Sequence, residues 1–155
     1  MPQEARIAVE VSHPIARVQP QLYSQFIEPL GKCVYDGIWV ADRPEIPQED
    51  GMRTFTMDAL RRIGPAVVRW PGGCFADQHH WRDGIGAPAE RPVRLNLWWG
   101  GTESHAFGTH EFFEFCKQIG AFPYICGNVG SGTVAEMRDW LEYCNVEEET
   151  TLTEE

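Results

Sequence analysis

The chain has 155 residues and a formal net charge of −10, with 43% hydrophobic and 23% charged residues. This composition supports one packed domain of ordinary size, but the length is too short for a complete (β/α)₈ barrel, which takes roughly 250 residues. The acidic balance argues against nucleic acid or an anionic membrane surface as the main partner, because clustered Lys and Arg bind both.

The N-terminal segment and the cysteines bear on the cellular location. Residues 1–11 carry charges and have no apolar core of a secretion signal, and no apolar run approaches the ~18 residues of a membrane span. The five cysteines are odd in number and scattered along the chain. We therefore predict free thiols and a cytoplasmic location.

The first third of the chain predicts strands and a loop. Apolar and polar residues alternate over 7–11, which predicts a short strand, and residues 22–27 predict a second strand that ends at Glu28. The segment 31–51 contains prolines and an acidic pair and predicts a loop.

The rest of the chain alternates between helical and strand patterns. Helices are predicted to be capped by Thr56, Thr109 and Thr133, and glycines end the first two. Their expected inner faces repeat at helical spacing: Met57, Leu60 and Ile63; Phe112, Phe115, Cys116 and Ile119; Val134, Met137, Leu141 and Cys144. Strands are predicted over 66–70 and 122–126. This alternation predicts a parallel sheet of βα units, either doubly wound or a barrel.

Candidate site residues gather at the ends of the predicted strands, where parallel α/β folds place their sites. Arg69 stands at one strand end, before a Pro71-Gly72-Gly73 turn that lets the backbone approach a ligand closely. Glu28 ends an earlier strand and can accept hydrogen bonds from ligand hydroxyls. The alternatives explain these residues equally well: a tight turn with Arg69 in a structural ion pair, and a solvated or salt-bridged loop glutamate at Glu28.

Two further groups of residues could contact a ligand. The connection 71–108 is unusually long and holds Trp81, Trp98 and Trp99, whose faces suit sugar rings; packing onto the rim of the fold is the alternative for at least one of them. Asn128 follows a strand and could offer its amide to a ligand, although a turn asparagine is the simpler interpretation.

Neither a metal nor a dinucleotide cofactor is expected. Four histidines lie in this part of the chain: His79, His80, His105 and His110. They lack the spacing of metal ligands, and Cys74 and Asp77 do not complete a ligand set with them. The segment 127–132 matches the dinucleotide-binding glycine pattern only in part.

Seven motifs occur in order along the chain: Phe26–Gly31, Arg69–Asp77, His80–Gly86, Arg91–Arg94, Trp99–Gly101, Phe107–Phe112 and Tyr124–Val134. Together they resemble the α-L-arabinofuranosidases of glycoside hydrolase family 51, and the resemblance covers about Ile7 to Asn145. It implies an α/β fold in which residues 1–20 give a strand to an accessory β-sandwich and 21–145 form about three βα units of a (β/α)₈ TIM barrel. Residues 146–155 would be an acidic truncated end.

The resemblance also implies the activity. The enzymes of this family are retaining glycosidases that release terminal arabinofuranosyl units from arabinan, arabinoxylan or arabino-oligosaccharides, without metal or cofactor and often as homo-oligomers. Their two catalytic glutamates lie on the fourth and seventh barrel strands. We therefore expect no catalytic carboxylate in this chain, which would be the inactive N-terminal portion of a larger enzyme.

What the resemblance assigns to this chain is a sugar pocket. Glu28 would hold arabinose hydroxyls, the Gly73–Cys74 turn would present backbone N–H groups, and Arg69 would orient charge around the nucleophile. The remaining candidates for substrate binding are Trp98, Trp99 and Asn128. A non-catalytic carbohydrate-binding remnant of the same barrel fits these residues equally, and a more remote alternative is another barrel hydrolase with a metal at His79 and His80.

Overall fold

The computed structural model describes residues 3–147, 150–152 and 154. Seven strands and three α-helices occur in chain order: β1 (Gln25–Phe26), β2 (Gln48–Glu49), β3 (Met52–Arg53), α1 (Thr54–Ile63), β4 (Val67–Trp70), β5 (Arg94–Leu95), β6 (Thr102–Glu103), α2 (Thr109–Ile119), β7 (Phe122–Ile125) and α3 (Val134–Asn145). Short 3₁₀ helices occupy Pro20–Tyr23, Cys74–Gln78, Trp81–Gly84 and Pro88–Glu90. No helix in these residues is long and apolar enough to cross a membrane.

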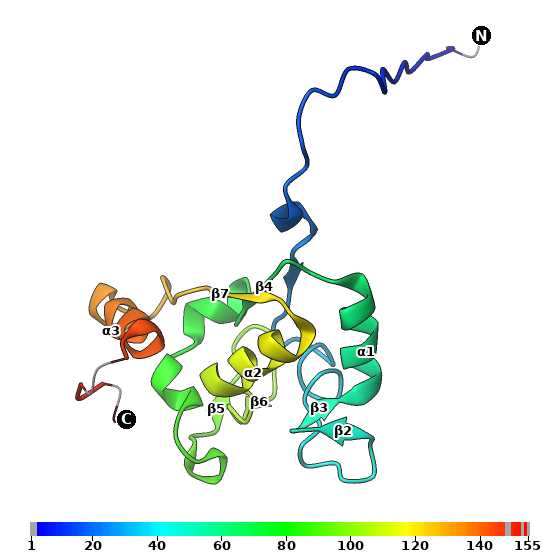
Figure 1. The fold of residues 1–155 in the computed structure, drawn as a ribbon. Coiled ribbons are helices and arrows are strands. Elements are labelled where there is room, and N and C mark those ends of the chain that lie inside the picture. The colour runs from blue at the N-terminus through cyan, green and yellow to red at the C-terminus, as the bar shows by residue number, and fades with distance from the viewer. Residues whose placement is uncertain (1–2, 148–149, 153, 155) are drawn as a thin grey trace.

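The central sheet has three parallel strands in the order β1-β4-β7, which confirms the parallel α/β prediction. β4 and β7 match the predicted strands to within one residue. β1 is shorter than predicted, because Pro20 starts a 3₁₀ helix and leaves only Gln25 and Phe26 to pair with Val68 and Arg69. In Figure 1, α1 and α3 lie on opposite sides of the body formed by the sheet and α2.

The N-terminal segment does not form the strand predicted over 7–11. Residues 3–19 run away from the body, in blue in Figure 1, and are exposed throughout. Ile7, Val9 and Val11 alternate as a strand would, but no described segment pairs with them, and a strand needs a neighbour to satisfy its backbone groups. The predicted loop 31–51 consists mostly of turns, and its end pairs with Met52–Arg53 as the small β2–β3 hairpin.

The helix ends match the predictions better than the helix starts. Gly64 and Gly120 end α1 and α2 with φ of 64° and 74°, the left-handed conformation that glycine adopts without strain. Thr56 lies inside α1, which begins two residues earlier. Its hydroxyl donates to the carbonyl of Gly37 at 2.6 Å, so its predicted capping role is wrong.

The second predicted cap is also wrong and the third is confirmed. Gly108 is the N-cap of α2, and its N–H donates to the Glu111 carboxylate at 2.8 Å. Thr109 is the first helical residue and accepts a hydrogen bond from Trp140 Nε1 at 3.2 Å. Thr133 caps α3 by accepting the N–H three residues further on at 3.0 Å.

The core lies between β4, α2, the segment 27–57 and the long connection 71–108. All four residues of the predicted α2 face are buried: Phe112, Phe115, Cys116 and Ile119. Trp70 of β4 is fully buried and stacks on Phe112 with ring centroids 5.1 Å apart. The predicted face of α3 is mostly exposed. Val134 and Leu141 are exposed and Cys144 is partly buried against the core, while the one fully buried residue of α3, Trp140, lies outside the predicted face.

The connection 71–108 folds onto this core through one buried arginine. The Arg91 guanidinium makes two 3.0 Å bonds to the Glu111 carboxylate and also donates to the carbonyls of Gly86 and His105. Three 3₁₀ helices and the β5–β6 hairpin lie in this connection, and Trp81 is buried within it. The five cysteines are all free thiols, as predicted.

Candidate functional site

The candidate residues lie where the parallel strands end. Glu28 follows β1, the Pro71–Asp77 turn follows β4 and Asn128 follows β7, so three loops meet at the carboxyl edge of the sheet. This edge is the usual place for a ligand site in parallel α/β folds.

Glu28 is buried and held by the loop after β4. Its Oε1 accepts hydrogen bonds from the backbone N–H of Phe75 at 2.8 Å and of Gly73 at 3.2 Å, and the residue is 6% exposed. A Cβ at Gly72 would lie 2.6 Å from this oxygen, and Gly72 has a φ of 153°, so the turn requires glycine there. The carboxylate is therefore fixed in orientation through its Oε1.

This geometry changes the role expected for the Gly73–Cys74 turn. The N–H of Gly73 is bound by Glu28, so it is not presented to a sugar as predicted. Cys74 is exposed at the start of the next 3₁₀ helix and is the part of the turn that stays a candidate for contact with a ligand.

Arg69 lies beside this carboxylate, and no described carboxylate forms an ion pair with it. Its guanidinium stacks over the Phe26 ring, 4.4 Å from the centroid, and its Nε is buried with no hydrogen-bond partner in the described part of the chain. A Cβ on Gly73 would lie 3.8 Å from both Arg69 Nη2 and Glu28 Oε1. The structural ion pair considered from the sequence is therefore not formed, and a charged donor stands at the strand end.

Trp98 and Trp99 form a half-exposed turn between β5 and β6, with exposed fractions of 50% and 43%. Asn96 holds them in place: its Oδ1 accepts the backbone N–H of Trp98 at 3.2 Å and of Trp99 at 3.0 Å. Its Nδ2 donates to the carbonyl of Pro29 at 3.1 Å. Asn96 thus connects the tryptophan turn to the loop that carries Glu28. The sequence analysis missed it, although asparagine before a turn is a recognisable signal.

An open groove of about 430 Å³ lies beside Trp98, between this hairpin and the loops after β4 and β7. It is lined by Asp77, Gln78, Leu97, Trp98, Gly130 and Ser131. Gln78 fixes one wall, because its side chain donates to the carbonyl of Leu95 and accepts the N–H of Leu97. The groove has the concave shape and exposed tryptophan that suit a sugar chain.

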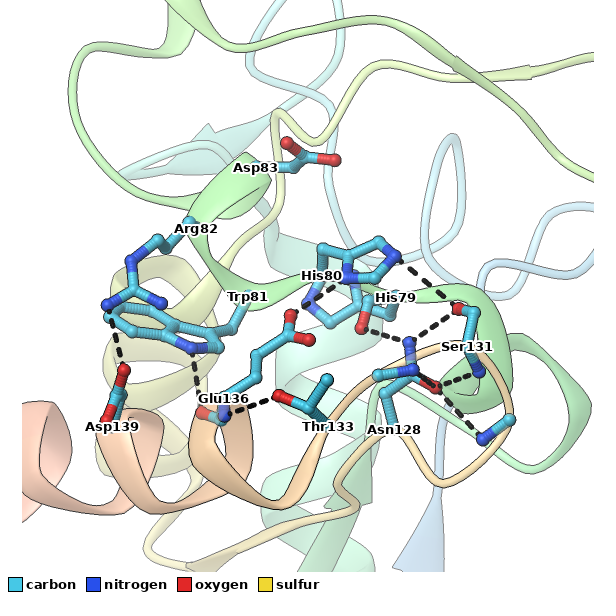
Figure 2. Close-up of polar contacts among 12 residues, drawn as sticks. His79, His80, Trp81, Arg82, Asp83, Asn128, Ser131, Thr133, Glu136 and Asp139 are labelled. Carbon is cyan, nitrogen blue, oxygen red and sulfur yellow. Dashed lines mark hydrogen bonds and ion pairs between the residues drawn. The ribbon is translucent and has the colours of Figure 1, made fainter.

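Asn128 is buried and uses its whole amide within the protein. Nδ2 donates to the carbonyl of His79 and to Ser131 Oγ, both at 3.0 Å, and Oδ1 accepts the N–H groups of Gly130, Ser131 and Gly132 at 2.9–3.1 Å. Figure 2 shows these bonds converging on the amide. The turn interpretation of Asn128 therefore describes the structure, and its amide has no atom left over for a ligand.

His80 joins the loop after β4 to the start of α3. Its Nδ1 donates to Glu136 Oε1 at 2.8 Å, and its Nε2 lies 3.4 Å from Ser131 Oγ (Figure 2). The Ser131 hydroxyl has a closer acceptor in the Asp77 carbonyl, at 2.9 Å. Although the three side chains have the order of a Ser-His-Glu relay, these distances hold the loops together and do not activate the serine.

His79 lies beside His105, with ring centroids 5.9 Å apart, but the His105 ring bonds to the Pro92 carbonyl. His80 faces Glu136, while His79 is buried among aromatic rings, which lowers its pKa to about 3 through desolvation. Within residues 3–147, 150–152 and 154, no group of three or more His, Cys, Asp or Glu side chains could hold a metal ion.

Comparisons with known proteins agree with one another. A sequence model described as "Alpha-L-arabinofuranosidase 1 domain" matches residues 59–155. An intracellular exo-alpha-L-arabinofuranosidase of Bacteroides ovatus is 48% identical over 140 residues, which is 90% of this chain and 27% of that protein. A probable alpha-L-arabinofuranosidase C of Aspergillus clavatus is 43% identical over 139 residues, again 27% of its length.

Solved structures show the same relationship. The GH51 arabinofuranosidase from Xanthomonas axonopodis pv. citri superposes with a TM-score of 0.89 at 46% identity, covering 94% of this chain and 30% of that one. The thermostable GH51 alpha-L-arabinofuranosidase from Thermotoga petrophila RKU-1 gives 0.82 at 44% identity, with 86% and 28% covered. The chain therefore has the α/β fold of a segment of these structures and spans less than a third of their length.

Proposed function

The chain belongs to the family of alpha-L-arabinofuranosidase 1 domains, and from this membership we propose that it is the N-terminal part of a retaining α-L-arabinofuranosidase. Residues 21–145 would be the first three βα units of its (β/α)₈ barrel. The sequential order β1-β4-β7, with α1 after β1, α2 after β4 and α3 after β7, supports this. Residues 1–20 would give a strand to an accessory β-sandwich. Residues 148, 149, 153 and 155 of the acidic end 146–155 lie outside the described residues.

The observation that carries this proposal is the position of Glu28. It is a buried carboxylate at the carboxyl end of β1, oriented through Oε1 by two backbone N–H donors, and its Oε2 would accept hydrogen bonds from sugar hydroxyls. Such charge-assisted hydrogen bonds are strong and directional. A merely solvated glutamate would be exposed and would have no fixed orientation.

The reaction would be hydrolysis with retained configuration at the anomeric carbon. That mechanism uses two carboxyl groups about 5 Å apart, one as nucleophile and one as acid/base. By the family resemblance both are glutamates of the fourth and seventh strands, outside these 155 residues. This chain would then bind and orient the sugar. Glu28 would accept hydrogen bonds from the sugar hydroxyls. Arg69, whose Nε has no partner among the described residues, would orient charge around the nucleophile.

The proposed substrates are terminal arabinofuranosyl units of arabinan, arabinoxylan or arabino-oligosaccharides. Trp98 and Trp99 would form the wall of the cleft that receives the glycan, and their half-exposed rings support this. We also propose that the full-length enzyme is cytoplasmic, forms homo-oligomers and needs no cofactor. The name of the Bacteroides relative, which contains the word intracellular, supports the location.

The test is an assay of the full-length polypeptide that carries this chain. We expect turnover of 4-nitrophenyl α-L-arabinofuranoside, with the first-formed arabinose in the retained configuration by proton NMR, and little turnover of the matched β-D-xylopyranoside. Binding of arabino-oligosaccharides without turnover would instead identify a carbohydrate-binding remnant, and inverted product would exclude the retaining mechanism.

A further inference from the structure

The His79 imidazole is buried and makes no hydrogen bond to any described residue. It is 3% exposed and lies among aromatic rings, with its centroid 5.1 Å from that of Trp70 and 5.7 Å from that of Trp140. Among the described residues, neither Nδ1 nor Nε2 has a partner, and the neighbouring Trp70 Nε1 is unpartnered as well. Buried polar atoms of this kind are rare in folded proteins and usually indicate a bound water or ion.

The protonation state sets what His79 requires. Desolvation keeps the ring neutral at physiological pH, because it lowers the pKa to about 3. A neutral imidazole has one N–H donor and one acceptor nitrogen. A partner that both donates and accepts can therefore satisfy whichever nitrogen faces it.

A small cavity lies against the ring. It measures about 10 Å³ and is lined by His79, Trp81, Asn128, Glu136, Met137 and Trp140. A single water needs roughly 10–15 Å³ of such space and two to four polar partners. Glu136 also lines the cavity, and the bond from His80 goes to Oε1 of its carboxylate, so we assign Oε2 as the second partner. The cavity is too small for an organic ligand, and too few ligating groups surround it for a metal ion.

We propose that this cavity binds one internal water molecule, held between the His79 imidazole and the Glu136 carboxylate. The water joins the loop after β4 to the first turn of α3, beside the direct bond from His80 to the same carboxylate that is visible in Figure 2. Glu136 then receives bonds from two adjacent histidines, one direct and one through water. The water satisfies a buried ring that the described residues leave without a hydrogen bond.

The direct test is a crystal structure of the full-length polypeptide at a resolution that shows ordered water. The expected result is one density peak in the cavity, within hydrogen-bonding distance of a His79 ring nitrogen and of Glu136. An empty cavity would overturn the proposal. So would a side chain from outside these 155 residues bonded to His79.

A solution measurement with a matched control provides the second test. Oxygen-17 relaxation dispersion counts long-lived internal waters, and His79→Phe, which keeps a planar ring but removes both nitrogens, should lower that count by one. The same substitution at the exposed His13 should leave the count unchanged. An equal count in wild type and His79→Phe would contradict the proposal, and the crystal structure of the wild type decides the question if that variant does not fold.

Discussion

The helices α2 and α3 have similar lengths and opposite environments. α2 has 11 residues and buries five of them, while α3 has 12 residues and buries only Trp140. The strands before them differ in the same way, since β4 alternates between buried and partly buried residues and β7 is mostly exposed. Both helices are amphipathic, but among the described residues only α2 has a second layer that covers its apolar face.

The exposed region is continuous. An apolar groove of about 450 Å³ runs between β7 and α3, and Phe122 and Tyr124 of β7 are exposed beside it. β7 is also an edge strand whose outer side pairs with no described strand. One sheet therefore has a buried region, formed by β4 and α2, and an open edge, formed by β7 and α3. Each of the following predictions tests this difference.

The largest effect is expected at the open edge. Residues 1–155 expressed alone should self-associate and should lack arabinofuranosidase activity, because an unpaired apolar edge strand recruits other chains. Light scattering after size-exclusion chromatography measures the association. The double variant Phe122→Lys/Tyr124→Lys should shift the distribution toward monomer, whereas a monodisperse, cooperatively melting wild-type chain would show that the edge is not a liability.

The next effect separates the two helices directly. Phe112→Ala in α2 removes a fully buried ring that stacks on Trp70 and should lower the free energy of unfolding by about 3–5 kcal/mol. Leu141→Ala on the exposed face of α3 should change it by no more than about 0.5 kcal/mol. Urea denaturation of residues 1–155 carrying Phe122→Lys/Tyr124→Lys measures both, because the later units of the proposed barrel would cover α3 in the full-length polypeptide. Equal losses would mean that α3 is covered as well as α2.

A pH effect is expected from His79, which lies where the two regions meet. In the unfolded protein this histidine has a pKa near 6.5, whereas in the folded protein its pKa is about 3. Between these values the unfolded state binds more protons, so the free energy of unfolding falls as pH falls, by up to about 1.4 kcal/mol per pH unit. His79→Phe should reduce this slope, and His13→Phe should keep it. A slope unaffected by the His79 substitution would refute the assignment.

The smallest effect concerns the start of α3. Thr133→Ala removes the hydroxyl that caps the helix and should cost about 1 kcal/mol. Thr133→Ser keeps an oxygen there and should cost much less. If both variants lose the same stability, the cap does not hold this helix, and its single buried tryptophan must do so.

Local patterns predicted the elements, and tertiary partners decided their surroundings. Both helix-ending glycines and both longer parallel strands could be predicted, because glycine conformation and apolar runs are local properties. Thr56 and Thr109 could not be excluded as caps, since their hydroxyls go to Gly37 and Trp140, which are distant in sequence. The apolar face of α3 was predicted from the same helical spacing as that of α2, and only the fold shows that the described residues leave most of it exposed.

The candidate site followed the same division. Position at a strand end was enough to select Glu28 and Arg69. The sequence could not show that the N–H of Gly73 is bound by Glu28 or that the amide of Asn128 is fully used, because such bonds join residues from different loops. Asn96, which links the tryptophan turn to Pro29, became visible only once those loops were placed together.

The most direct test of the central claim is the effect of Glu28 on catalysis. In the full-length polypeptide, Glu28→Ala should weaken transition-state binding by about 2–4 kcal/mol, the scale of charge-assisted bonds to a buried ligand. This corresponds to a fall of roughly 30- to 900-fold in kcat/KM on an aryl α-L-arabinofuranoside. Glu28→Gln, which keeps an oxygen for the two backbone donors, separates loss of the loop from loss of the charge, and the exposed Glu49→Ala serves as control. A large loss in both Glu28 variants with Glu49→Ala unaffected is the predicted result, and an unchanged kcat/KM in Glu28→Ala would show that this carboxylate only supports the loop.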